Sequence, residues 1–396
     1  MPMVKLLLLY SNAVGVAAHK MTMRPPTSRY YWYRWSLQVL LLLCVPLFLQ
    51  KGYAASTATP SNPCIRGGGE DVGADKNDAL MKKEMEDWIR LSSRSGTRFV
   101  AALDQSGGST PKALKVYGIS ENEYERGTES MFKLVHDMRT RVMTAPSFNQ
   151  DNIMGAILFL DTLERDVVEN VGVQMRTADY LWHFKHIVPF LKIDVGLDKI
   201  HNDVQLMKPI PNLDSLLQDV QRQGHPIFGT KMRSVIHRAN SQGIQDVVAQ
   251  QFDVAEQILS HGFVPIIEPE VEIHASDKAQ AEEILKKLLL KHLDALNSYV
   301  ILKLTMPSVP NFYQECIDHP NCLCVLALSG GYSQQDAVEL LSRNPKMIAS
   351  FSRAFTEGLK ADQSDEDFQG TLEKSIRLII QGQQQQEESP QDQQEL

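Results

Sequence analysis

The chain has 396 residues, 43% hydrophobic and 22% charged, which is enough to bury a large core, and one α/β barrel would account for most of this length. Its formal net charge of -8 at pH 7 excludes the broad basic surface that attracts nucleic acids or anionic membranes, so we expect neither as a partner of the folded part. An anionic substrate therefore requires local cations. The five cysteines lack the spacing of a disulfide framework or a zinc site, which favours a reducing final compartment.

Residues 1–75 are predicted to be a targeting leader followed by a disordered linker. The apolar run 37–49 follows Arg34 and precedes small residues at 54–56, which is the pattern of a signal peptide and is too short for a comfortable membrane span. Residues 56–75 are rich in Ser, Thr, Pro and Gly, as disordered linkers are. We expect routing through the secretory pathway to an organelle, with a plastid as the destination. An uncleaved membrane anchor and a cytoplasmic location are the alternatives.

Short apolar runs then alternate with amphipathic stretches, which is typical of a parallel sheet with helical crossovers. Apolar residues recur every three or four positions over 244–258, and 281–296 shows a similar pattern, so both segments are predicted helices. No Gly-x-Gly-x-x-Gly motif opens a helix after the first strand, which disfavours a nucleotide-binding sheet. The sequence predicts one (β/α)8 TIM barrel over 76–382 and a disordered Gln/Glu-rich tail over 383–396. The candidate strands are 99–103, 155–159, 189–193, 227–232, 263–267, 299–304, 323–328 and 347–350.

Lys303 stands alone in the apolar run of the sixth predicted strand. Burying an ammonium group without compensation costs several kcal/mol, so the group either finds partners or loses its proton. A desolvated lysine in a barrel is the nucleophile that Schiff-base enzymes use on carbonyl substrates. The alternative is a structural lysine with a buried stem, whose head group reaches water or a carboxylate.

Polar residues gather at the carboxyl ends of the predicted strands, where barrel enzymes carry their active sites. Three pairs stand two residues apart and so share one face of their strand. In a closed barrel, inward-pointing cations need anionic partners, and a carboxylate beside a candidate nucleophile is also what acid–base chemistry requires. The glutamates are therefore either ion-pair partners or proton-transfer groups. The pairs are Lys192 with Asp194, Lys231 with Arg233, and Glu268 with Glu270.

Gly-rich loops at 106–109 and 329–331 follow the first and seventh predicted strands. Glycine lets backbone N–H groups approach an anion closely, and barrels often bind phosphate after the seventh strand. Arg353, three residues after Ser350, adds a charge-assisted contact. Either loop alone is weak evidence, because an ordinary turn has the same composition. One on each side of a lysine-bearing barrel indicates a substrate with two phosphates.

Five segments resemble class I fructose-bisphosphate aldolases, especially the shorter bacterial form. They are AALDQSGGST at 101–110, VPIIEPE at 264–270, LKLT at 302–305, LSGGYS at 328–333 and ASFSRA at 349–354. The resemblance extends from about residue 83 to residue 381 in the matching order. It implies reversible, metal-free cleavage of fructose 1,6-bisphosphate to dihydroxyacetone phosphate and glyceraldehyde 3-phosphate, in glycolysis, gluconeogenesis or carbon fixation. It also implies sugar phosphates as the only ligands, no cofactor beyond the covalent Schiff base, and a homo-oligomer.

The resemblance assigns a role to each candidate residue. Lys303 matches the Schiff-base lysine, Glu268 the proton-transferring glutamate, and Asp104 the aspartate near the C4 hydroxyl. Lys231 and Arg233 match the basic pair of the fourth strand, and Lys231 is expected to help keep Lys303 neutral by like-charge repulsion. The phosphate residues are Ser329, Gly330, Gly331, Ser350 and Arg353 for the phosphate on C1, and Ser106, Ser109 and Lys192 for the other.

One departure concerns the tail. Animal-type members end in a tyrosine that assists protonation of the enamine, whereas this chain ends in Gln394-Glu395-Leu396, so the acid for that step is left open. The alternative functions are another Schiff-base barrel, such as a transaldolase or a dehydratase, and a non-catalytic scaffold barrel. His183 and His186 are interpreted as one helix face before the third strand rather than as metal ligands.

Overall fold

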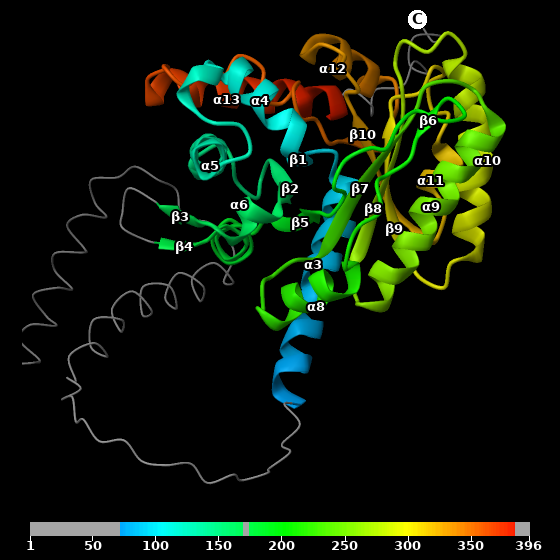
Figure 1. Cartoon of the computed structure of the whole chain (residues 1–396), viewed down its shortest axis with the longest axis horizontal. Coiled ribbons are helices and arrows are strands. Elements are labelled where there is room, and N and C mark those ends of the chain that lie inside the picture. Colours follow the sequence, from blue (N-terminus) through cyan, green and yellow to red (C-terminus); the bar gives the residue numbers. More distant parts are fainter. Residues whose placement is uncertain (1–71, 169–173, 385–396) are drawn as a thin grey trace, which may run out of the picture. The chain divides into compact units, whose positions relative to one another are not determined.

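The computed structural model describes residues 72–168 and 174–384, and in them eight parallel strands form a nearly closed barrel (Figure 1). The strand order around the barrel follows the chain order. The first and last strands meet where the Ala102 N–H donates to the Phe351 carbonyl at 3.3 Å. The predicted TIM barrel is confirmed. Its strands are β1 (Phe99–Leu103), β2 (Ile153–Phe159), β5 (Val188–Lys192), β7 (Gly229–Ile236), β8 (Val264–Val271), β9 (Val300–Thr305), β10 (Cys322–Leu328) and β11 (Met347–Ala349).

All eight predicted strands are present, but β7 and β8 extend four residues beyond their predicted ends. The two strands continue to pair from Ser234 opposite Pro269 to Ile236 opposite Val271. The extension of β7 also pairs with the short antiparallel strand β6 (Val204–Gln205), which the sequence analysis missed. A second missed feature is the hairpin of β3 (Asp166–Val168) and β4 (Gln174–Arg176). These short pairings carry too few residues for alternation to show in the sequence.

Helices pack on the outside of the barrel, with α9 (Ser241–Ser260) against β7 and β8, and α10 (Lys278–Ala295) beside it (Figure 1). The predicted apolar stripe of α9 is buried from Ile244 to Ile258. Both predicted helices are confirmed. The others are α3 (Val72–Ser95), α4 (Thr110–Tyr117), α5 (Glu129–Thr144), α6 (Leu160–Glu164), α7 (Thr177–Asp179), α8 (Leu213–Arg222), α11 (Gln314–Ile317), α12 (Gln334–Ser342) and α13 (Asp365–Gln384), with single turns η1 (Gly107–Ser109), η2 (Glu121–Glu123) and η3 (Tyr180–Phe184).

Helix α3 closes the amino end of the barrel, opposite the predicted active site. The Trp88 indole N–H donates to the Met154 carbonyl at 3.2 Å, at the start of β2. The Arg90 guanidinium lies over the Tyr299 ring, 5.0 Å from its centroid, directly before β9. Ile89, between the two, is fully buried. Helix α3 is therefore part of the barrel core and not a loose extension of it.

The boundaries of the predicted leader and tail need small corrections. Helix α3 begins at Val72, and α13 continues to Gln384. Gln383 was assigned to the disordered tail, but it is a buried residue of α13. Its side-chain oxygen accepts a hydrogen bond from the Ala349 N–H, and its side-chain nitrogen donates to the Gly96 and Arg98 carbonyls. The rest of both predicted segments lies outside the described residues. In the part of the chain that the structure describes, no helix is both long and apolar enough to span a membrane.

Ile89→Ala is expected to lower the free energy of unfolding by about 2–4 kcal/mol, because it opens a cavity at the closed end of the barrel. Leu91→Ala on the same helix is the matched control: Leu91 is 62% exposed, so the expected change is within about 0.5 kcal/mol. Urea unfolding followed by circular dichroism measures both. Equal effects would contradict the assignment of α3 to the core.

Candidate active site

A cavity of about 510 Å³ opens at the carboxyl ends of the barrel strands, on the rim that the sequence predicted. Gly331 is the one candidate that does not line it. That glycine has φ +119 and lies behind the lining, where an added Cβ would be 3.4 Å from Arg353 Nη2. The candidates that line the cavity are Asp104, Ser106, Ser109, Lys192, Lys231, Arg233, Glu268, Lys303, Ser329, Gly330, Ser350 and Arg353.

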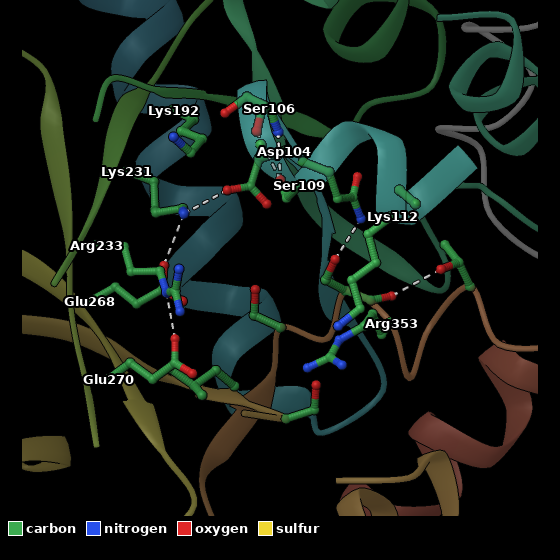
Figure 2. A pocket seen from close by; sticks show the side chains of 18 of the residues that line it. Asp104, Ser106, Ser109, Lys112, Lys192, Lys231, Arg233, Glu268, Glu270 and Arg353 are labelled. Carbon is green, nitrogen blue, oxygen red and sulfur yellow. Dashed lines mark hydrogen bonds and ion pairs between the residues drawn. The ribbon is translucent and has the colours of Figure 1, made fainter. Parts of the chain in front are cut away.

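Lys231 is the centre of a buried charge cluster (Figure 2). Its Nζ is 2.6 Å from Asp104 Oδ2 and 3.0 Å from Glu268 Oε2, and Asp194 Oδ2 lies 4.0 Å away. The Lys231 side chain is only 3% exposed. The predicted need for anionic partners is confirmed: Asp104 and Asp194 follow β1 and β5, and Glu268 lies within β8.

Lys303 faces the same carboxylate from the next strand. Its Nζ is 3.4 Å from Glu268 Oε1, and all six residues of β9 are buried. The two oxygens of Glu268 therefore face two different lysines, Lys303 and Lys231. The head group of Lys303 meets a carboxylate inside the cavity and does not reach bulk water. Covalent catalysis by a lysine requires such an arrangement, with the amine next to a group that can accept and return its proton.

The electrostatics of the cluster are set by mutual pairing. Burial opposes ionisation of Asp104, but the charges of Lys231 and Lys303 outweigh it and hold the pKa of Asp104 well below its usual value. Burial likewise opposes ionisation of Glu268, and the same two lysines lower the pKa of Glu268. Burial also disfavours the ammonium of Lys231, yet Asp104, Glu268 and Asp194 together raise the pKa of Lys231. At neutral pH, Lys231 is thus a fixed cation between ionised carboxylates.

The remaining cations of the strand pairs also have partners. Arg233 Nε donates to Glu270 Oε2 at 2.5 Å. Lys192 Nζ donates to the backbone carbonyl and to Oδ1 of Asp194, both at 2.6 Å. Glu270 is thus the ion-pair partner of Arg233, whereas Glu268 is the glutamate that faces Lys303. Glu268 is also an ion-pair partner, of Lys231, so its role in proton transfer stays a prediction.

The loops after β10 and β11 together line one wall of the cavity. Gly330 has φ +56, and a Cβ there would lie 2.7 Å from Ile273 Cγ2, so a larger residue does not fit without movement. Ser350 is 1% exposed, and its hydroxyl has no hydrogen-bond partner among the described residues. Arg353 also lines the cavity and is labelled in Figure 2. A phosphate oxygen would satisfy the buried hydroxyl beside this arginine.

The loop after β1 forms a second wall, next to the loop after β11. The Ser106 N–H donates to Ser109 Oγ at 3.0 Å, and that hydroxyl donates to the Ser106 carbonyl at 2.9 Å, which closes the turn η1. Lys112, in the first turn of α4, also lines the cavity, although the sequence analysis did not select it. The sequence did carry a signal for Lys112: it stands three residues after Ser109, at the start of a helix that follows a Gly-rich loop, which is a common place for anion-binding residues.

Gln105 ties these two walls together across the meeting point of β1 and β11. Its Nε2 donates to Ser352 Oγ at 2.6 Å. Arg139, fully buried on α5, donates to the Gln105 carbonyl and, at 2.6 Å, to Thr162 Oγ1. Burial lowers the pKa of Arg139 to about 10, against the opposing charge of Asp104. Sequence reasoning missed Arg139 because an arginine on an amphipathic helix is usually exposed.

The histidine pair does not form a metal site. Across residues 72–168 and 174–384, no group of three or more His, Cys, Asp or Glu side chains is placed to hold a metal ion. His183 lies in the π-helical turn η3, but His186 follows that turn with φ +56. The predicted helix position is right for His183 and wrong for His186, because the chain leaves the helix at Lys185 to enter β5.

The charge cluster is expected to make the free energy of unfolding fall as the pH becomes acidic. The pKa of Asp104 is lowered from 3.8 in the folded state, so its stabilising contribution is present above that value and is lost as the pH falls below it. The free energy of unfolding is therefore expected to fall more steeply below about pH 5 in the parent than in Asp104→Asn. Urea titrations at a series of pH values measure this difference. The control Asp137→Asn removes an exposed partner of Lys133 and should follow the parent. Parallel curves for the parent and Asp104→Asn would contradict this account.

Comparison with known proteins agrees with this geometry. The family model for fructose-bisphosphate aldolase class-I matches residues 93–321. Fructose-bisphosphate aldolase class 1 of Porphyromonas gingivalis is 56% identical over 288 residues, covering 73% of this chain and 96% of the relative. The enzyme of the same description from Synechocystis is 54% identical over 303 residues, covering 76% of this chain and 98% of the relative.

A solved structure shares the fold. Fructose-bisphosphate aldolase from Plasmodium falciparum, crystallised with TRAP and a small-molecule inhibitor, superimposes with a TM-score of 0.60 at 18% identity, covering 78% of this chain and 97% of that one. The resemblance, the barrel and the lyase class expected from the sequence are confirmed. The chain belongs to the class I fructose-bisphosphate aldolase family.

Proposed function

We propose that this chain cleaves fructose 1,6-bisphosphate reversibly to dihydroxyacetone phosphate and glyceraldehyde 3-phosphate, with Lys303 as the nucleophile. The observation that carries the assignment of the nucleophile is the buried contact of 3.4 Å between Lys303 Nζ and Glu268 Oε1, at the mouth of a barrel. The two loop walls support a substrate with a phosphate at each end.

The first half of the reaction forms the Schiff base. The Lys303 amine adds to the C2 carbonyl, and Glu268, ionised through its contacts with Lys231 and Lys303, accepts the proton that the nitrogen releases. Glu268 passes that proton to the C2 oxygen, which becomes the hydroxyl of a carbinolamine. A second proton, taken up from solvent water through Glu268, then lets this hydroxyl leave as water and gives an iminium ion. Lys231 remains charged throughout and stabilises whichever carboxylate is ionised.

The second half breaks the carbon–carbon bond. Loss of the C4 hydroxyl proton to Asp104 or Glu268 turns that oxygen into a carbonyl, the C3–C4 bond breaks, and its electron pair moves to the iminium to give an enamine. Glyceraldehyde 3-phosphate leaves. A proton added at C3, followed by water at C2, releases dihydroxyacetone phosphate and frees Lys303. The low pKa of Asp104 keeps its carboxylate ionised at neutral pH, so it can accept the proton, but the same low pKa makes it a weak base.

The phosphate groups are proposed to bind on the two walls. The unpartnered Ser350 hydroxyl, the Gly330 turn and Arg353 suit one phosphate. The predicted residues for the other are Ser106, Ser109 and Lys192, to which the cavity adds Lys112. Transaldolases and dehydratases would not need both walls, which favours the bisphosphate. We also propose that the reaction needs no metal, because the lysine supplies the electron sink. The expected homo-oligomer remains a prediction that light scattering would check.

The additional segment before the barrel is proposed to be a targeting leader. Nearly all of each bacterial relative is matched by about three quarters of this chain, so the rest is additional to the shared enzyme. The apolar run at 37–49 and the small residues after it support secretory routing to a plastid. A fluorescent protein carrying residues 1–75 should reach that organelle and lose the apolar run. Diffuse cytoplasmic fluorescence would contradict the proposal.

Incubation with dihydroxyacetone phosphate and sodium borohydride is expected to leave a reduced triose-phosphate adduct on the peptide that contains Lys303, identified by mass spectrometry. Lys303→Met should lose the adduct, whereas Lys192→Met, which changes another lysine of the cavity, should keep it. Activity should persist in a chelator. No adduct on a folded parent would overturn the covalent mechanism, and an adduct on Lys231 would reassign the nucleophile.

Gly330→Ala is expected to raise KM for the bisphosphate about tenfold, since strain at φ +56 and the contact with Ile273 distort the anion site by an amount worth about 1–2 kcal/mol. Gly370→Ala on α13 is the control, because a Cβ there meets no atom within 4 Å. Steady-state kinetics on both variants checks this expectation. An unchanged KM for Gly330→Ala would remove this loop from the phosphate site.

A further inference from the structure

Strands β8 and β9 separate at the level of Glu268 and Lys303. Their parallel ladder ends where Ile267 lies opposite Leu302. The next residues along the two strands are Glu268 and Lys303, whose side chains meet in the cavity. On their other sides both strands stay paired beyond this point, β8 with β7 and β9 with β10. The separation is therefore confined to the space between β8 and β9 at the rim.

Pro269 explains why the ladder ends there. The backbone groups of successive residues in a strand point alternately to its two neighbours. The Glu272 N–H, directly after β8, donates to the Ile236 carbonyl of β7 at 2.9 Å, so the even-numbered residues of this part of β8 face β7. The odd-numbered residues, among them Pro269 and Val271, face β9. The next hydrogen bond of the ladder would have to come from the N–H of residue 269, and proline has none.

The side chain of Thr305 joins the two strands again beyond this gap. Its Oγ1 accepts from the Val271 N–H at 2.9 Å and donates to the Val271 carbonyl at 2.8 Å. Thr305 is 1% exposed and Val271 is fully buried, so bulk water does not reach these groups. One hydroxyl thus satisfies both backbone groups that β8 turns toward β9 at this position.

The methyl group of Thr305 has a different neighbour, the loop after β10. A Cβ built on Gly330 would lie 3.8 Å from Thr305 Cγ2. The hydroxyl therefore contacts β8, whereas the methyl group lies near the wall of the cavity that carries Gly330. A substitution that removes only the hydroxyl tests the link to β8 and leaves the contact with this wall in place.

We infer that Thr305 is a positioning residue, whose hydroxyl fixes the spacing of β8 and β9 and so holds Glu268 opposite Lys303. The inference rests on the proposed function, in which these two side chains exchange a proton across 3.4 Å. Without the hydroxyl, the buried N–H and carbonyl of Val271 lose their partner, and the end of β8 moves to find another. A small displacement of a proton-transfer group slows chemistry strongly.

Thr305→Val keeps the shape of the side chain and removes the hydroxyl. It is expected to lower kcat for cleavage of fructose 1,6-bisphosphate about tenfold and to leave KM within about twofold, because the hydroxyl bonds to Val271 and not to a candidate phosphate residue. Thr305→Ser keeps the hydroxyl and should retain kcat within about threefold of the parent. Steady-state kinetics on the full chain measures both constants.

Thr177→Val is the matched control. Thr177 is fully buried on α7, and its hydroxyl donates to the Arg165 carbonyl at 2.9 Å, away from the residues that line the cavity. This variant should lower the melting temperature, as Thr305→Val does, because each loses a buried hydroxyl that bonds to the backbone. It should keep kcat within about twofold of the parent. Thermal unfolding of all variants thus separates loss of stability from loss of rate.

The outcomes separate the inference from the proposed function. If Thr305→Val is folded and keeps the parental kcat, or if it and Thr177→Val lose kcat equally, the positioning role is overturned while the Lys303 adduct on the parent still stands. A folded Thr305→Ser whose kcat falls about tenfold also overturns it, whether or not Thr305→Val folds. If the parent forms no adduct, the proposed function fails whatever the variants do. A loss of kcat confined to Thr305→Val and recovered in Thr305→Ser supports the inference.

Discussion

Burial of ionised groups is the constraint on which the active end of this barrel depends. Lys231, Asp104, Glu268 and Lys303 are all less than a tenth exposed, and none of them would be tolerated there alone. Each charge offsets the desolvation of its neighbours, so the cluster is stable as a unit. The neighbouring pairs, Arg233 with Glu270 and Lys192 with Asp194, extend the same compensation around the rim.

The opposite end of the barrel is closed mainly by apolar packing. Helix α3 closes it mainly with apolar side chains, and its contacts with the starts of strands include the Trp88 N–H on a backbone carbonyl and the Arg90 guanidinium over a ring face. Stability is thus concentrated at one end and chemistry at the other. This division lets the loops of the rim adopt left-handed turns, such as that of Gly330, without weakening the core.

Sequence reasoning predicted the barrel and the residues of its rim because both depend on local patterns. Lys303 in an apolar run and Lys231 two residues before Arg233 can be recognised without any partner in view. Contacts between distant segments were not predicted: Gln105 with Ser352, Arg139 beneath them, and Gln251 behind Glu268 join residues whose types are ordinary for their helix or loop. The short pairings of β6 also depend on a neighbouring strand, and no pattern of their own marks them.

The buried amide of Gln383 has a consequence for how the barrel is made. This residue, near the end of α13, connects the backbone beside β11 with the carbonyls of Gly96 and Arg98 that lead into β1. Helix α13 follows every barrel strand in the chain, so this support for β1 comes from a segment that is synthesised after all eight strands. Closure of the ring thus depends on a residue that belongs to none of the strands it joins.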